Sequence, residues 1–136
     1  MKKYVLDTNV ISEMRKRKPH GAVLAWLSSL QEQEVCLAAV TLGELQRGME
    51  RTLKLDRSKA REIETWINLL ERVYQIVPMD SPCFREWARL MERKSDDLIE
   101  DAMIAATARV HNLVVATRND ADFKDFDVEV FNPFKT

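Results

Sequence analysis

The chain has 136 residues, of which 46% are hydrophobic and 32% charged, and its net charge is −1. This composition is typical of one soluble globular domain and excludes a surface that is basic throughout, but a local basic patch remains compatible with it. No apolar run is long enough to span a membrane, and no apolar segment follows the N-terminal lysines as in a secretory signal, so we expect a cytoplasmic protein.

Short apolar runs alternate with amphipathic segments along the chain. The apolar runs predict strands at residues 4–6, 35–40, 75–79, 113–116 and 128–131. Apolar residues at helical spacing predict helices at residues 10–17, 23–30, 41–51, 63–74, 81–91 and 97–111. This alternation indicates one α/β domain over residues 1–136, with a five-stranded, mostly parallel sheet and helices on both faces.

The cysteines, histidines and glycines show no motif of their own. Cys36 and Cys83 have neither redox nor metal-ligand spacing, and His20 and His111 have no Cys or second His at such spacing. We therefore expect buried structural cysteines and no zinc site. The three glycines form no phosphate-binding loop, which argues against a P-loop or a dinucleotide fold.

Carboxylates stand where the predicted strands end. Asp7 ends the first strand, Glu44 lies early in the helix after the second, Asp101 lies one turn into the helix before the fourth, and Asp122 follows the fourth. In open α/β sheets ligands bind beyond the carboxyl ends of the strands, so these acids are expected to converge on a site.

Each of these acids also has a structural interpretation. Asp7 would cap the following helix, and Glu44 would form a capping box with Thr41. Asp101 would favour the positive end of its helix dipole, and Asp122 would be a turn residue. Taken one at a time, none of the four identifies a site.

Asp101 is the acid for which the structural interpretation is weakest. It shares a helix stripe with Ile104, Ala105 and Ala108 and should face inward, and no Lys or Arg lies three or four residues away. An inward carboxylate is costly unless it is paired or binds a metal. Converging carboxylates without His or Cys suit Mg²⁺ or Mn²⁺, and such a site supports phosphodiester hydrolysis.

Four segments of the sequence resemble the PIN-domain ribonucleases, in particular the VapC/FitB-like toxins of toxin–antitoxin modules. They are residues 6–12 (LDTNVIS), 41–45 (TLGEL), 99–108 (IEDAMIAATA) and 115–119 (VATRN). The resemblance covers almost the whole chain, down to residues 130–134 (VFNPF). Each motif alone is weak, but together, in this order and at this spacing, they are specific.

The resemblance implies a Mg²⁺- or Mn²⁺-dependent endoribonuclease in which a metal-activated water hydrolyses tRNA, rRNA or mRNA. Members of this family are commonly homodimers, and a VapB-type antitoxin neutralises them in a hetero-oligomer. Operator DNA would then be bound only through the antitoxin.

By motif position, the resemblance makes Asp7 and Asp101 the metal ligands. Glu44 becomes the third catalytic acid, which places the water or acts as base. Thr8 and Asn9 are candidates to orient Asp7.

The resemblance does not decide which position of one loop carries the fourth catalytic acid. Some relatives carry it directly after Thr-Arg, where this chain has Asn119, and others just before the Phe, where it has Asp122. Asp120 is a third candidate. We favour Asp122 and expect supporting hydrogen bonds from Thr117 and Asn119.

RNA binding requires local positive charge. The run at residues 15–18, together with Arg47 and Arg51, is a candidate to contact phosphates, although a solvated helix end explains the run equally well. Arg118 is expected either to join them or to pair with a site carboxylate.

Two other functions use the same residues. A phosphatase with an aspartyl nucleophile at Asp7 would need a second acid two residues on, where this chain has Asn9. A catalytically inactive PIN-like binding module would keep the fold and the partner, but the complete set of Asp7, Glu44 and Asp101 argues against it.

Overall fold

The computed structural model describes residues 2–135, so Met1 and Thr136, the ends of the expected domain, lie outside the described residues. The strands are β1 (Tyr4–Leu6), β2 (Val35–Ala38), β3 (Gln75–Val77), β4 (Val114–Ala116) and β5 (Val130–Phe131). The α-helices are α1 (Thr8–Ile11), α2 (Gly21–Ser28), α3 (Ala39–Leu53), α4 (Arg57–Val73), α5 (Ser81–Met91) and α6 (Ile99–His111). Short 3₁₀ helices are η1 (Ser12–Arg15), η2 (Glu32–Glu34), η3 (Asp96–Leu98) and η4 (Asp120–Phe126). No helix in this part of the chain is long and apolar enough to cross a membrane.

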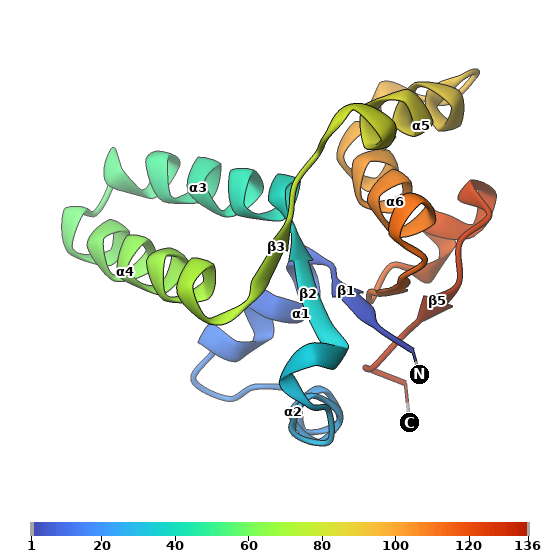
Figure 1. Cartoon of the computed structure of the whole chain (residues 1–136). Coiled ribbons are helices and arrows are strands. Elements are labelled where there is room, and N and C mark those ends of the chain that lie inside the picture. Colours follow the sequence, from blue (N-terminus) through green and yellow to red (C-terminus); the bar gives the residue numbers. More distant parts are fainter. Residues whose placement is uncertain (1, 136) are drawn as a thin grey trace.

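The five strands form one sheet in the order β3-β2-β1-β4-β5, and every neighbouring pair is parallel (Figure 1). β1 is central and pairs with β2 through Tyr4 and Val35, and with β4 through Tyr4 and Val114. The predicted α/β class and five-stranded sheet are confirmed. Because the strands are parallel, their carboxyl ends lie at one edge of the sheet.

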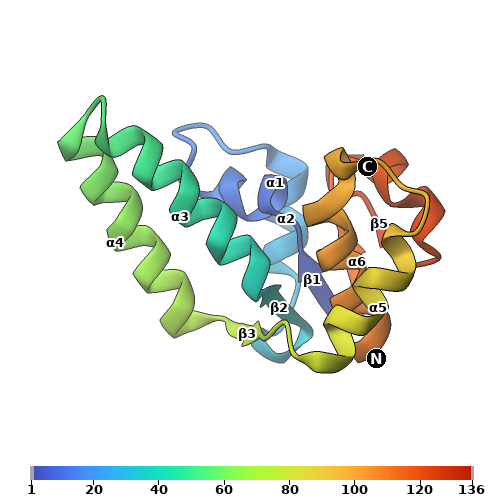
Figure 2. The same ribbon diagram turned by 90° about the horizontal axis from the view of Figure 1, so that it is seen from above.

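Side chains of the sheet alternate between two cores. Leu6 and Leu37 point into a core shared with α2, α3 and α4, whereas Val5 and Cys36 point into a core shared with α5 and α6. Figure 2 shows the two groups of helices on opposite sides of the strands. Burial on both faces explains why the strands are apolar throughout.

Several predicted boundaries differ from the structure. The helix expected at residues 10–17 is α1 and η1, which begin and end two residues earlier, and the third and fifth strands are shorter than expected. The second strand ends at Ala38, because the last apolar residues of the run expected at 35–40 form the first turn of α3. A short apolar run does not distinguish a buried strand from the start of a buried helix.

The ends of two other helices depend on single residues. Asn112 adopts a left-handed conformation (φ 55°) at the C-cap of α6, a conformation that Asn tolerates better than most residues. The N-cap of α5 is Asp80, whose carboxylate accepts a hydrogen bond from the Cys83 N–H. Ser81 and Pro82, a pair that is typical of an N-cap followed by the first helical residue, are therefore the first two residues of α5 instead.

Candidate active site

The predicted acids are carried by separate elements that meet at the carboxyl edge of the sheet. Asp7 directly follows β1, Glu44 lies on α3, Asp101 lies in the first turn of α6, and Asp122 lies in η4 after β4. Figure 2 shows β1 between α3 and α6, and these two helices contact each other. The fold thus brings together residues that lie far apart in the sequence.

Asp7 is buried and held by three hydrogen-bond donors. Its Oδ1 accepts from the Thr8 N–H at 2.8 Å, and its Oδ2 accepts from the Thr117 hydroxyl at 2.7 Å and from the Asn9 amide at 3.2 Å. The side chain is only 5% exposed. The expected roles of Thr8, Asn9 and Thr117 beside Asp7 agree with these contacts. Asp7 also caps α1, so its structural and functional interpretations are compatible.

Thr8 connects the first two acids. Its backbone N–H donates to Asp7, and its hydroxyl donates to Glu44 Oε1 at 2.9 Å. A single residue therefore fixes the carboxylates of Asp7 and Glu44 relative to each other. The sequence indicated that Thr8 orients Asp7. Its hydrogen bond to Glu44 could not be predicted from neighbouring residues, because it depends on how α3 packs.

The Thr117 turn anchors Asp7 from the other side. The Thr117 hydroxyl accepts a hydrogen bond from the Asn119 backbone N–H at 3.0 Å, and the Asn9 side-chain Oδ1 accepts from the Arg118 backbone N–H at 3.0 Å. The supporting role expected of Asn119 is thus exerted through its backbone. These bonds tie the loops after β1 and β4 together around Asp7.

The carboxyl group of Asp101 has the most strongly shifted pKa in the site. Its pKa is raised to about 7, chiefly by burial and then by the negative charges of its neighbours, in the order Asp7, Asp122, Glu44 and Glu100. Ile104, Ala105 and Ala108, which share its stripe, are all buried. The prediction that Asp101 lies on the inward stripe of its helix agrees with this packing.

Asp7 and Glu44 are shifted in the same direction. The pKa of each is raised, chiefly by burial, although hydrogen bonds to each carboxylate act to lower it. The charge of Asp122 also raises the pKa of Asp7, and the charge of Asp7 raises that of Glu44. No Lys or Arg among residues 2–135 forms an ion pair with either acid or with Asp101. The site therefore holds negative charge that the described side chains leave uncompensated.

The two loop aspartates lie in different surroundings. Asp120 forms an ion pair with Lys135 at 3.1 Å and lies 3.4 Å from the Asn132 amide, so it belongs to contacts with the C-terminal segment. Asp122, in contrast, raises the pKa of both Asp7 and Asp101 by its charge. This charge effect, together with the pairing of Asp120 elsewhere, favours Asp122 as the fourth acid, which remains a prediction.

Matched substitutions distinguish the two loop aspartates. For the ribonuclease activity that the sequence resemblance implies, we expect Asp122→Asn to lower RNA cleavage by about tenfold, because it removes a negative charge that acts on the site. Asp120→Asn makes the same chemical change on the same loop and should leave the rate within about twofold of wild type. Single-turnover cleavage by both purified variants measures this, and the opposite order of effects would transfer the assignment to Asp120.

The interpretation of Glu44 and Thr41 as a capping box is wrong. Helix α3 begins at Ala39 with Ala38 as its N-cap, so Thr41 already lies within the first turn. The Thr41 hydroxyl is buried and has no hydrogen-bond partner among residues 2–135. Glu44 instead accepts its hydrogen bond from Thr8, which removes the local explanation for this acid.

Glu100 is a further charged neighbour of the site, which the sequence motifs did not single out. Its charge raises the pKa of Glu44 and of Asp101, and its carboxylate lies 3.8 Å from the Arg47 guanidinium. Arg47, the first basic residue of α3, therefore lies beside the acidic cluster.

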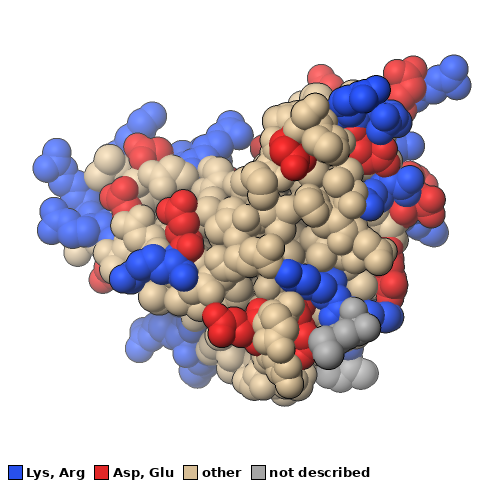
Figure 3. Space-filling model, viewed as in Figure 1, with Lys and Arg blue, Asp and Glu red and all other residues tan. Residues whose placement is uncertain are grey.

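The other basic residues are distributed unevenly. Arg15 stacks over the Trp66 ring, Lys16 pairs with the buried Glu13, and Arg118 lies 4.2 Å from the Phe134 ring centroid, so these three have structural partners. Figure 3 shows basic side chains gathered over the outer end of the α3–α4 hairpin. The exposed cations of that region are Arg51, Lys54, Arg57, Lys59 and Arg61.

A cavity lies at the opposite edge of the sheet, where the strands begin. It has a volume of about 560 Å³ and includes Lys2, Arg109, Asp127 and Glu129 in its lining. These charges already pair with one another, Lys2 with Glu129 and Arg109 with Asp127. This cavity lies away from the acidic site and offers no comparable set of unpaired acids.

Comparison with known proteins gives consistent matches over nearly the whole chain. Residues 4–129 match the PIN domain family. The chain is 36% identical over 135 residues to Toxin FitB of Neisseria gonorrhoeae, with 96% of this chain and 97% of that protein covered. It is 33% identical over 142 residues to VapC ribonuclease Y4jK of Sinorhizobium fredii, with the same coverage. A solved structure of FitAB bound to a DNA fragment superposes with a TM-score of 0.84 and 34% identity, covering 98% and 96% of the two chains.

Proposed function

Because this chain belongs to the PIN domain family, we propose that it is a Mg²⁺- or Mn²⁺-dependent endoribonuclease and the toxin of a toxin–antitoxin system. The observation that carries the proposal is the meeting of Asp7, Glu44 and Asp101 at one sheet edge, without a pairing cation among residues 2–135. Its similarity to a protein named as a toxin and to one named as a ribonuclease supports it.

The donor set fits a hard divalent cation. All candidate ligands are carboxylate oxygens, which Mg²⁺ and Mn²⁺ prefer, and the pKa of about 7 at Asp101 reflects negative charge that a cation would neutralise. Asp7 and Asp101 would hold the ion, since Mg²⁺ takes few protein ligands. When bound, such an ion neutralises charge on the phosphodiester and lowers the pKa of an attacking water.

The residues of the chain supply orientation and a proton acceptor. Three donors fix the direction of the Asp7 carboxylate before substrate binds. Glu44 is held by the Thr8 hydroxyl, and its raised pKa brings it closer to the value that suits a general base near neutral pH. We assign Glu44 to accept the proton of the attacking water, and Asp122 to add negative charge around the same centre.

The substrate is proposed to be tRNA, rRNA or mRNA, bound by cations beside the acidic site. Arg47 lies next to the cluster through Glu100, and Arg51 lies farther along α3. Further basic side chains gather at the outer end of the α3–α4 hairpin (Figure 3). Phosphate contacts of this kind supply affinity without reading sequence. The cytoplasm, where these RNAs are found, is the proposed place of action.

The proposed protein partners follow from the relatives. A cognate VapB-type antitoxin would bind the chain, and the proposed assembly is a homodimer within a toxin–antitoxin hetero-oligomer. The DNA fragment in the FitAB structure supports operator binding by such a complex, which we assign to the antitoxin.

The proposed activity is tested with Asp7→Asn. Asn keeps the size of the side chain and its ability to cap α1, so the variant should fold, while loss of a metal ligand lowers RNA cleavage by about a thousandfold. Expression of wild type without antitoxin should arrest growth, and expression of the variant should not.

The outcome also separates the alternatives. A wild-type protein that binds the antitoxin but cleaves no RNA in Mg²⁺ would be the inactive binding module. A phosphoryl group trapped on Asp7 would indicate the phosphatase. The Asn9 amide, which donates to Asp7 where that enzyme needs an acid, argues against the phosphatase.

A further inference from the structure

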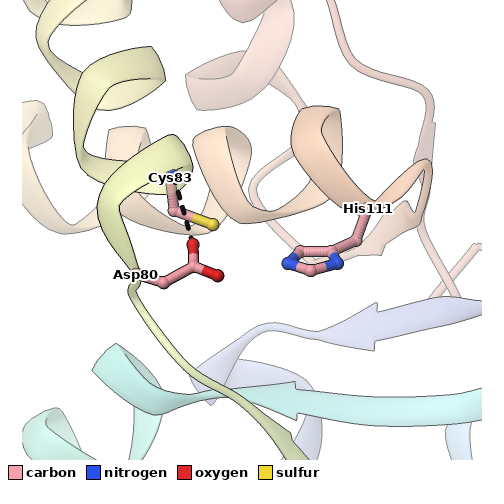
Figure 4. A group of neighbouring side chains, drawn as sticks. All are labelled: Asp80, Cys83 and His111. Atoms are coloured by element: carbon pink, nitrogen blue, oxygen red, sulfur yellow. Dashed lines mark hydrogen bonds between the residues drawn. The ribbon is translucent and has the colours of Figure 1, made fainter.

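A second group of metal-ligating side chains lies apart from the acidic site. Asp80, Cys83 and His111 each offer one ligand atom, and these three atoms all lie within 4.8 Å of one another. Figure 4 shows the carboxylate of Asp80 and the thiol of Cys83, at the start of α5, facing the imidazole of His111 at the end of α6. Asp101 is ten residues before His111 on α6, which places the two groups about 15 Å apart along the helix axis.

The packing of two helices creates this group. α5 and α6 are consecutive helices that pack closely against each other, so the first turn of α5 lies beside the last turn of α6. Cys83 is fully buried at their interface, and Asp80 caps the helix that carries it. Sequence spacing gave no zinc motif because Cys83 and His111 lie on different helices and meet only through this packing.

We propose that Asp80, Cys83 and His111 form a Zn²⁺ site that links the start of α5 to the end of α6. A thiolate, an imidazole and a carboxylate are the three ligand types that zinc combines in proteins, with water or another group in the fourth position. The soft sulfur and the imidazole also separate this site from the all-carboxylate cluster, whose oxygens suit Mg²⁺.

The geometry permits binding after a small side-chain movement. Zinc–ligand bonds of about 2.0–2.3 Å place tetrahedral ligand atoms roughly 3.3–3.8 Å apart. The three ligand atoms already lie within 4.8 Å of one another, so they need to approach by at most about 1–1.5 Å. Asp80 and His111 are exposed and have room to move, whereas Cys83 is fixed in the interface. The two exposed ligands would let the ion enter from solvent and close over the thiol.

Helix capping explains only part of the arrangement. As N-cap, Asp80 needs to bond the backbone N–H of Cys83, which it does at 3.3 Å. Capping requires neither a thiol at Cys83 nor an imidazole opposite it. The convergence of three different ligand types is the observation that points to a metal.

Cobalt substitution tests the site directly. Purified full-length protein, with Mg²⁺ in excess to occupy the carboxylate site, is titrated with Co²⁺, which gives a thiolate-to-metal charge-transfer absorption only when a Cys sulfur binds it. We expect this band to saturate at one Co²⁺ per chain and to disappear on addition of Zn²⁺. Cys83→Ser should abolish it.

Matched variants identify the other ligands. Asp80→Asn retains the N-cap, and both it and His111→Gln should weaken Co²⁺ binding by about tenfold or more. Cys36→Ser and His20→Gln change the same residue types elsewhere and should leave the band and the affinity unchanged. The proposal is overturned by the absence of a thiolate band in wild type, by its persistence in Cys83→Ser, or by unaltered affinity in both Asp80→Asn and His111→Gln.

Discussion

Asp101→Asn should abolish RNA cleavage, with a loss of about a thousandfold or more, corresponding to ~4 kcal/mol of transition-state stabilisation. The substitution keeps the size of the side chain but replaces a proposed metal ligand by a neutral amide. It also removes the electrostatic repulsion that the Asp101 carboxylate experiences from Asp7, Asp122 and Glu44. Single-turnover cleavage of a defined RNA in Mg²⁺ measures the loss.

The matched control is Asp97→Asn. Asp97 is exposed in the 3₁₀ turn that precedes α6, so the variant has the same change of charge without a change in the site. Its cleavage rate should stay within about twofold of wild type. Wild-type activity in Asp101→Asn would show that this carboxylate is not a metal ligand.

The metal-free protein should become less stable as the pH rises from 5 to 8. A carboxyl group whose pKa is about 7 in the folded state, against an ordinary value of 3.8, keeps its proton in the folded state after the unfolded chain has lost it. Its contribution to stability is present at low pH and is lost as the pH rises through 7. For the partly buried Asp101, we expect the free energy of unfolding to fall by about 1–3 kcal/mol.

Asp7 and Glu44 act in the same direction, because their pKa values are also raised. The lowered pKa values of Glu13, Glu86 and Asp120 act in the opposite direction, but at lower pH, where those acids become protonated. Urea denaturation of chelator-treated protein at several pH values gives the slope. Asp101→Asn should reduce it, and an unchanged slope in that variant would contradict the assigned pKa.

Much of the fold could be predicted from local patterns. Runs such as residues 113–116 are apolar on both sides because the parallel sheet is covered by helices on both faces, and the left-handed Asn112 marks a helix end. The end of β2 could not be predicted, because Ala39 and Val40 continue the apolar run into the first turn of α3. That boundary depends on how α3 packs against the sheet.

The candidate site was predictable to the extent that single residues mark strand ends. Asp7, Glu44 and Asp101 are placed at one edge by topology, so their positions followed from the order of strands and helices. The difference between Asp120 and Asp122 was not predictable, since it depends on Lys135 and Asn132, which come from the distant C-terminal segment.

The hydrogen bond between Thr8 and Glu44 is another contact between residues far apart in the sequence. It joins the loop after β1 to α3, and only the packed structure brings the two residues within 2.9 Å. Side chains that orient catalytic acids by hydrogen bonds are harder to predict from a sequence than the acids themselves. Hydrogen-bond donors such as Thr are common along a chain, and their partners lie far away in the sequence.

The metal dependence of RNA cleavage tests the central claim most directly. Wild-type protein is treated with a chelator, and single-turnover cleavage of RNA is followed while Mg²⁺ or Mn²⁺ is added back. We predict no cleavage in the metal-free protein, saturable recovery with either ion, and no recovery in Asp7→Asn or Asp101→Asn. Cleavage that continues at the same rate without metal, or recovers fully in either variant, would contradict the account.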